Sequence, residues 1–104
     1  MIALPAQVTF ATAPRVLGEA AREADAALRA GAPGGVVLEV DLSRCSAFDS
    51  SLLAVLLELQ RRTTAAGARC RLHHSPANLR KLAALYGVDA LVFAASEPDG
   101  ALPA

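Results

Sequence analysis

The chain has 104 residues, 54% of them hydrophobic and 19% charged, with a formal net charge of zero at pH 7. This length fits one domain with a single core. The charge balance gives no electrostatic reason to expect binding to nucleic acid or to an anionic membrane surface. No apolar run approaches the roughly 20 residues of a membrane-spanning helix, and the N-terminus lacks a signal-peptide pattern. We therefore expect a soluble cytoplasmic module without direct membrane insertion.

The first third of the chain predicts an edge strand followed by a helix. Residues 2–10 include the strand-forming Val8 and Phe10 but are interrupted by Pro5, which favours an edge position. Residues 15–30 are rich in alanine and stop at Gly31, as is typical of a helix. Because the apolar residues of this helix fall on one stripe, we expect it to lie on a sheet.

Residues 36–42 and 49–66 predict the centre of the fold. The run 36–42 is β-branched and aliphatic apart from Glu39 and Asp41, as in a mostly buried central strand. After a loop, Asp49 can cap a helix that extends to about residue 66. The apolar residues of that helix spread over about 200° of arc, more than the roughly 100° needed to pack on one layer. Either part of this arc contacts a partner, or the N-terminal strand or the last helix covers it.

The last third of the chain predicts a strand, a helix and a tail. Residues 68–73 alternate polar and apolar side chains, which indicates a strand with one wet face near the sheet edge. A helix is expected up to Tyr86, with Gly87 as its stop, followed by a short strand or turn at 91–93. We therefore expect residues 1–93 to form one domain. Residues 94–104 contain little to pack and are expected to be a flexible C-terminal tail.

The sequence contains few patterns that are typical of catalytic or cofactor-binding sites. His73 and His74 are adjacent in a predicted strand, so we expect them to point to opposite faces, and we expect no metal site. Neither a glycine-framed serine nor a glycine-rich phosphate loop is present. Cys45 and Cys70 lack CxxC spacing and are expected to be packing residues. An enzyme or nucleotide-binding protein is thus the least favoured class, and we expect no cofactor.

The start of the helix at 49–66 is the candidate functional point. A phosphate on Ser50 would meet the backbone N–H groups and the positive end of the helix dipole, but it would lie beside the like charge of Asp49. Residues at spacings of three and four follow Ser50 along one edge of the helix. The candidate partner-binding residues are Asp49, Ser50, Ser51, Leu53, Leu57 and Arg61. The alternative is an ordinary capping sequence with no further role.

Three stretches of the chain resemble the STAS domain family, which includes the anti-sigma factor antagonists. They are residues 37–43, residues 48–57 with the Asp49-Ser50-Ser51 turn, and residues 66–72. The resemblance covers roughly residues 2–93. Within the family, the short length, the start at Ile2-Ala-Leu-Pro and the run Leu82-Ala-Ala-Leu-Tyr-Gly87 are most similar to MlaB-type subunits of phospholipid-transport ABC complexes.

This resemblance implies an α/β fold, a small STAS-type mixed β-sheet with helices packed mainly on one face, and no catalysis. Ser50 matches the serine or threonine that partner kinases phosphorylate in the antagonists and that MlaB-type proteins place near their ATPase. Many family members have glycine two residues later, where this chain has Leu52. That departure favours the transporter subunit over a phosphorylation switch.

We therefore expect a subunit that docks on and regulates a cytoplasmic ABC ATPase. Its role would lie in phospholipid transport between bacterial membranes, which maintains the lipid asymmetry of the outer membrane. The chain would be peripheral to the inner membrane through its complex. The alternative is an anti-sigma factor antagonist that binds a serine kinase and is released by phosphorylation of Ser50.

Overall fold

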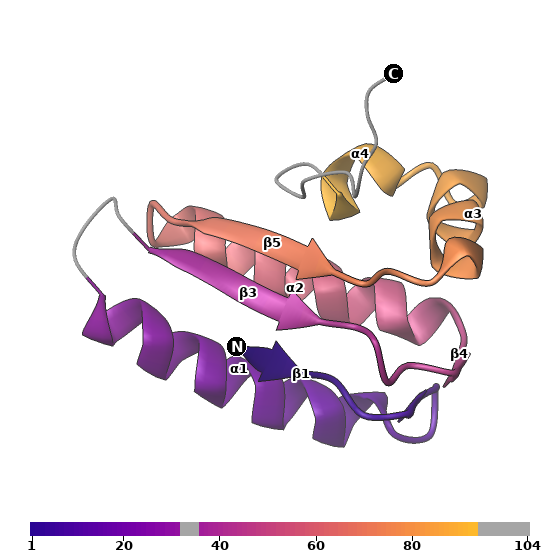
Figure 1. The fold of residues 1–104 in the computed structure, drawn as a ribbon, viewed down its shortest axis with the longest axis horizontal. Helices are drawn as coiled ribbons and strands as arrows, with labels where there is room; N and C mark the ends of the chain where they lie inside the picture. Colours follow the sequence, from indigo (N-terminus) through magenta and orange to yellow (C-terminus); the bar gives the residue numbers. More distant parts are fainter. Residues whose placement is uncertain (32–35, 94–104) are drawn as a thin grey trace.

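The computed structural model describes residues 1–31 and 36–93, so the tail expected at 94–104 lies outside the described residues. Figure 1 shows strands and helices that alternate along most of the chain. The elements are β1 (Ile2–Ala3), β2 (Gln7–Val8), α1 (Ala13–Ala30), β3 (Val37–Asp41), β4 (Ala47–Phe48), α2 (Ser50–Ala65), β5 (Arg69–His73), α3 (Ala77–Leu85) and α4 (Asp89–Val92).

Two small parallel sheets organise these elements. The larger has the strand order β1-β3-β5, and β2 pairs with β4 in the smaller. The expected α/β fold is confirmed, with β3 in the centre and β5 at an edge. The described strand pairs differ from the expected mixed sheet because all three are parallel. The connection from β1 to β3 contains β2 and helix α1, and the connection from β3 to β5 contains β4 and helix α2. Such crossovers return the chain in the same direction.

The three-stranded sheet is covered on one face. In β3 and β5 the buried side chains alternate with partly exposed ones, so that Leu38, Val40 and Leu72 point inward while Glu39 and His73 point outward. The inward face packs against α1 and α2, and Figure 1 shows α2 behind β3 and β5. Helices packed mainly on one face are therefore confirmed.

Helix α2 buries its wide apolar arc within the chain itself. It packs against β5, α1, α3 and α4. Leu53, on the edge expected to be available for a partner, is only 3% exposed and belongs to the hydrophobic core. Coverage by other segments of this chain, the last helices included, thus accounts for most of the arc. The buried residues of α2 are Leu52, Leu53, Val55, Leu56, Leu59 and Thr63.

The strand or turn expected at 91–93 is instead the end of the one-turn helix α4. The N–H groups of Leu91 and Val92 both donate to the Val88 carbonyl, at 3.0 and 2.9 Å. This turn places Val92 in the core and leaves Leu91 exposed. Three residues are too few to show a helical period, which explains why the sequence suggested a strand or a turn.

Replacing Leu56 with alanine should strongly destabilise the fold. Leu56 is 1% exposed in the core, and a buried leucine-to-alanine change costs about 2–5 kcal/mol of unfolding free energy. Leu85→Ala is the matched control, because Leu85 is 80% exposed and its loss should change stability by about 0.5 kcal/mol or less. Urea unfolding of both variants measures the difference, and equal losses would contradict the packing described for α2.

Candidate functional site

Asp49 joins the start of α2 to the loop that follows β2. One carboxylate oxygen, Oδ1, accepts the N–H of Ser51 at 2.8 Å, and the other, Oδ2, accepts the N–H of Phe10 at 2.9 Å. The expected helix cap is therefore confirmed. The N–H groups of Phe10 and then Ser51 hold the pKa of Asp49 below its usual value, because both hydrogen bonds favour the charged carboxylate. A charged Asp49 thus fixes the position of Phe10 relative to α2.

An apolar groove lies beside this cap, between the first turns of α1 and α2. Its volume is about 380 Å³, and Phe10 on its rim is 84% exposed. The lining residues are Phe10, Ala13, Pro14, Leu17, Ser51, Ala54 and Val55. Of the predicted site residues only Ser51 lines this groove. Sequence reasoning had assigned Phe10 to a strand, although β2 ends at Val8.

Ser50 is the first residue of α2 and is half-buried. Among the residues that the structure describes, no hydrogen bond is formed by its hydroxyl. Leu52, at the position where family members often have glycine, has a fully buried side chain. Leu52 therefore faces the core and does not cover Ser50.

The structure separates the remaining candidate residues from the cap. Leu53 is in the core and offers no surface. Leu57 and Arg61 line a second groove of about 530 Å³, between α2 and α4, together with Leu91. At 1.5 Å per residue, Arg61 lies about 16 Å along the helix axis from Ser50. The six predicted residues therefore do not form one surface.

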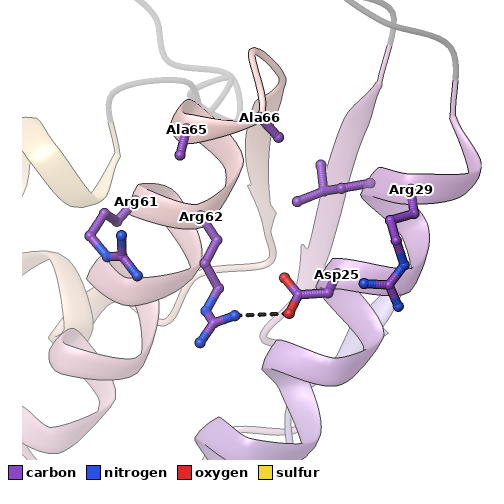
Figure 2. A pocket seen from close by; sticks show the side chains of 7 residues that line it. Asp25, Arg29, Arg61, Arg62, Ala65 and Ala66 are labelled. Atoms are coloured by element: carbon purple, nitrogen blue, oxygen red, sulfur yellow. Dashed lines mark hydrogen bonds and ion pairs between the residues drawn. The ribbon is translucent and has the colours of Figure 1, made fainter.

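A third pocket, of about 360 Å³, lies between the C-terminal ends of α1 and α2. Figure 2 shows Arg61 and Arg62 of α2 on one side and Asp25 and Arg29 of α1 on the other. A guanidinium nitrogen of Arg62 lies 2.9 Å from Oδ2 of Asp25, which bridges the two helices. Arg61 and Arg62 both bind Glu58, and the Arg61 contact above all lowers the pKa of Glu58 to about 2.

His73 and His74 lie at the carboxyl end of β5, and both contact acidic residues of β3. Nε2 of His73 is 2.6 Å from Oε1 of Glu39, and Nδ1 of His74 is 3.1 Å from Oδ1 of Asp41. The expectation that the two imidazoles point to opposite faces is wrong, because Glu39 and Asp41 share the open face. His74 has a left-handed backbone with φ of 58°, which ends the strand alternation.

These polar groups do not form a metal centre. Within residues 1–31 and 36–93, no group of three or more His, Cys, Asp or Glu side chains is arranged to hold a metal ion. Asp41 instead accepts the backbone N–H of Ser43 at 3.0 Å and its hydroxyl at 2.9 Å. The backbone bond from Ser43, followed by the His74 contact, lowers the pKa of Asp41. Cys45 and Cys70 are free and buried, as packing residues are.

Replacing Asp49 with alanine should lower the thermal midpoint by a few degrees at neutral pH. The variant loses the bonds to Phe10 and Ser51, whereas Asp49→Asn keeps a side-chain acceptor and should lose less. Because the pKa of Asp49 is lowered on folding, its charge stabilises the fold above the unfolded pKa of about 3.9, and this contribution disappears as the pH falls through the folded pKa. Thermal unfolding at pH 7 and at lower pH tests this, and a difference between wild type and Asp49→Ala that does not shrink in acid would contradict it.

Of three comparisons with known proteins, one gave a match, to a family model over residues 6–93. None of the helices in the described parts of the chain is both long and apolar enough to span a membrane. No curated protein and no solved structure gave a significant match. A family model described as Mlab, STAS domain matches residues 6–93. Because this match covers most of the chain, the protein belongs to the Mlab, STAS domain family.

Proposed function

We propose that this chain is a non-catalytic subunit that docks on a cytoplasmic ABC ATPase and regulates it in phospholipid transport between bacterial membranes. Membership of the MlaB-type STAS family supports this role, and the chain would then lie in the cytoplasm, peripheral to the inner membrane through its complex. Transport of this kind maintains the lipid asymmetry of the outer membrane. The observation that carries the proposal is the apolar groove beside the Asp49 cap.

This groove has the properties of a docking surface. Phe10 leaves most of its ring in water, which is unfavourable unless another surface buries it. The backbone of Phe10 is held by Asp49, so the ring projects from a fixed point and a partner need not order the loop. Leu17 and Ala54 supply further apolar surface from α1 and α2. An aromatic anchor within a small apolar groove is the usual centre of a protein interface.

The proposed docking residues follow from these positions. We keep the three residues that form or flank the cap as docking residues: Asp49, Ser50 and Ser51. Leu53 is left out, since a charged substitution there would disrupt the core and could not report on binding alone. Phe10, Leu17 and Ala54 are added from the geometry of the groove.

Ala54→Glu and Phe10→Asp should each reduce binding to the ATPase at least tenfold while the chain stays folded. Both side chains are exposed in the isolated chain, and each variant would place a charge in an apolar interface. Co-purification of the tagged chain with the ATPase, followed by affinity measurement, gives the readout. Leu85→Glu, on an exposed position of α3 outside the groove, is the control and should bind normally. Wild-type affinity in both groove variants would remove this surface from the proposal.

A second candidate function is that of an anti-sigma factor antagonist whose partner kinase phosphorylates Ser50. The free Ser50 hydroxyl at the start of α2 favours it, and the buried Leu52 side chain does not cover that hydroxyl. A phosphate at this point would lie next to the carboxylate of Asp49, and the repulsion between the like charges would weaken the hydrogen bond that Asp49 accepts from the Phe10 N–H. Modification would thereby loosen the same groove that the partner uses.

Incubation with a serine kinase of the anti-sigma type and ATP distinguishes this candidate. Mass spectrometry should then find one phosphate on the chain, which is lost in Ser50→Ala and retained in Ser51→Ala. Ser51 is the matched control because it is the neighbouring residue in the same turn. An unmodified wild-type chain that still binds the ATPase would exclude the switch and leave the transporter role standing.

A further inference from the structure

A second candidate surface lies along the C-terminal half of α2, away from the Asp49 cap. The groove between α2 and α4 and the pocket between α1 and α2 share two lining residues, Arg61 and Ala65. The two grooves therefore lie on either side of the ridge of α2 that carries Arg61 and Ala65. Leu91 lies on one side of this ridge and Arg29 on the other. We call these adjoining grooves the α2 C-terminal surface.

The α4 side of this surface presents an apolar side chain from a fixed position. Leu91 is 62% exposed and lines the groove with the half-buried Leu57. Helix α4 has a single turn, but Gln60 donates from Nε2 to the Val92 carbonyl at 2.8 Å and thereby ties it to α2. The guanidinium of Arg80 also lies 4.3 Å from the ring centre of Phe93. Leu91 is thus held by its neighbours while its own side chain stays in water.

The α1 side of the surface carries excess positive charge. Its arginines are Arg29, Arg61 and Arg62, and the acidic side chains among them are Asp25 and Glu58. Figure 2 shows the ion pair between Arg62 and Asp25 that leaves Arg29 to one side.

Two of these arginines can bind carboxylates of another molecule. Within the described residues Arg29 has no ion-pair or hydrogen-bond partner. Arg61 is 66% exposed, so its guanidinium can contact a further carboxylate while it remains near Glu58. The surface therefore combines an apolar groove with a cationic rim.

We propose that the α2 C-terminal surface binds a segment of a second protein that carries apolar side chains flanked by aspartate or glutamate. The apolar side chains would cover Leu57 and Leu91, and the carboxylates would pair with Arg61 and Arg29. Charge complementarity favours an acidic segment. The small excess of positive charge and the apolar groove fit a protein better than a nucleic acid, which needs many phosphate contacts. This surface is separate from the groove beside Asp49 and does not depend on the proposed function.

A pair of synthetic amphipathic peptides tests the proposal on the full-length chain. Both form helices with leucine at positions i, i+3, i+4 and i+7, and their remaining positions are mainly glutamate in one peptide and lysine in the other. Titration into the ¹⁵N-labelled chain should shift the amide signals of Leu57, Gln60, Arg61 and Leu91 with the glutamate peptide. Binding should weaken as salt is raised, since exposed charges are screened.

Matched variants assign the effect to this surface. Arg61→Gln and Leu91→Glu should each weaken binding of the glutamate peptide at least fivefold. Arg22→Gln and Leu85→Glu change exposed residues that line neither groove, and binding should not change. Ala54→Glu should also bind normally, which separates failure of this proposal from failure of docking beside Asp49.

Several results would overturn the proposal. Equal binding of the two peptides would remove the charge argument, and shifts centred on Phe10 would place the peptide at the other groove. Shifts at Leu91 that depend on protein concentration without peptide would identify a second copy as the occupant. Groove signals that move in Glu97→Gln/Asp99→Asn without peptide would identify the chain's own C-terminal segment as the occupant.

Discussion

Helix α2 has to bury apolar side chains around more than half of its circumference, and the positions of the other elements follow from this requirement. Burying one leucine contributes about 1.5–3 kcal/mol, so an exposed arc of several leucines would leave a small domain without enough stabilisation. The sheet covers one side of α2, α1 a second, and α3 and α4 a third. Even the polar Thr63 is accommodated, because its hydroxyl donates to the Leu59 carbonyl at 2.6 Å. In the part of the chain that the structure describes, the grooves lined by α2 lie beside its first turns and along its C-terminal half.

At the N-terminal end, one carboxylate serves the fold and the candidate site together. Asp49 satisfies a free N–H of α2 and places negative charge at the positive end of the helix dipole. Its second oxygen holds Phe10, which lies 39 positions earlier in the chain. The side chain that caps the helix therefore also holds the backbone that carries the exposed ring. A modification of Ser50 would affect both the helix cap and the position of Phe10, because Ser50 is adjacent to Asp49.

Local patterns were sufficient to predict the central elements of the fold. The aliphatic run at residues 36–42, the alternation in residues 68–73 and the cap at Asp49 depend on neighbouring residues, and the structure confirms the two strands and the helix they predict. The width of the apolar arc on α2 indicated how much of the helix surface had to be buried. Periodicity does not identify which segment of the chain buries it. Leu53 was therefore taken for an edge residue although it lies in the core.

Local sequence patterns could not predict the grooves, because each groove is formed by segments that are distant in the sequence. Phe10 and Ala54 both line the groove beside the cap, and Leu57 and Leu91 both line the groove between α2 and α4. The His74 error has a different origin, since strand alternation holds only while the backbone stays extended. A left-handed residue at the strand end turns the side chain to the other face.

The rigidity of α2 determines how its two end surfaces can act together. Transmission of a signal between sites requires an element with two alternative arrangements, and α2 is packed on three sides in a single continuous core. The two proposed docking points on such an element would instead fix the orientation of the whole domain, because a second contact prevents rotation about the first. When both are engaged within one complex, the second binds at a high effective concentration, so two small grooves can give an affinity that neither reaches alone. Weak individual surfaces are therefore compatible with a stably bound accessory subunit.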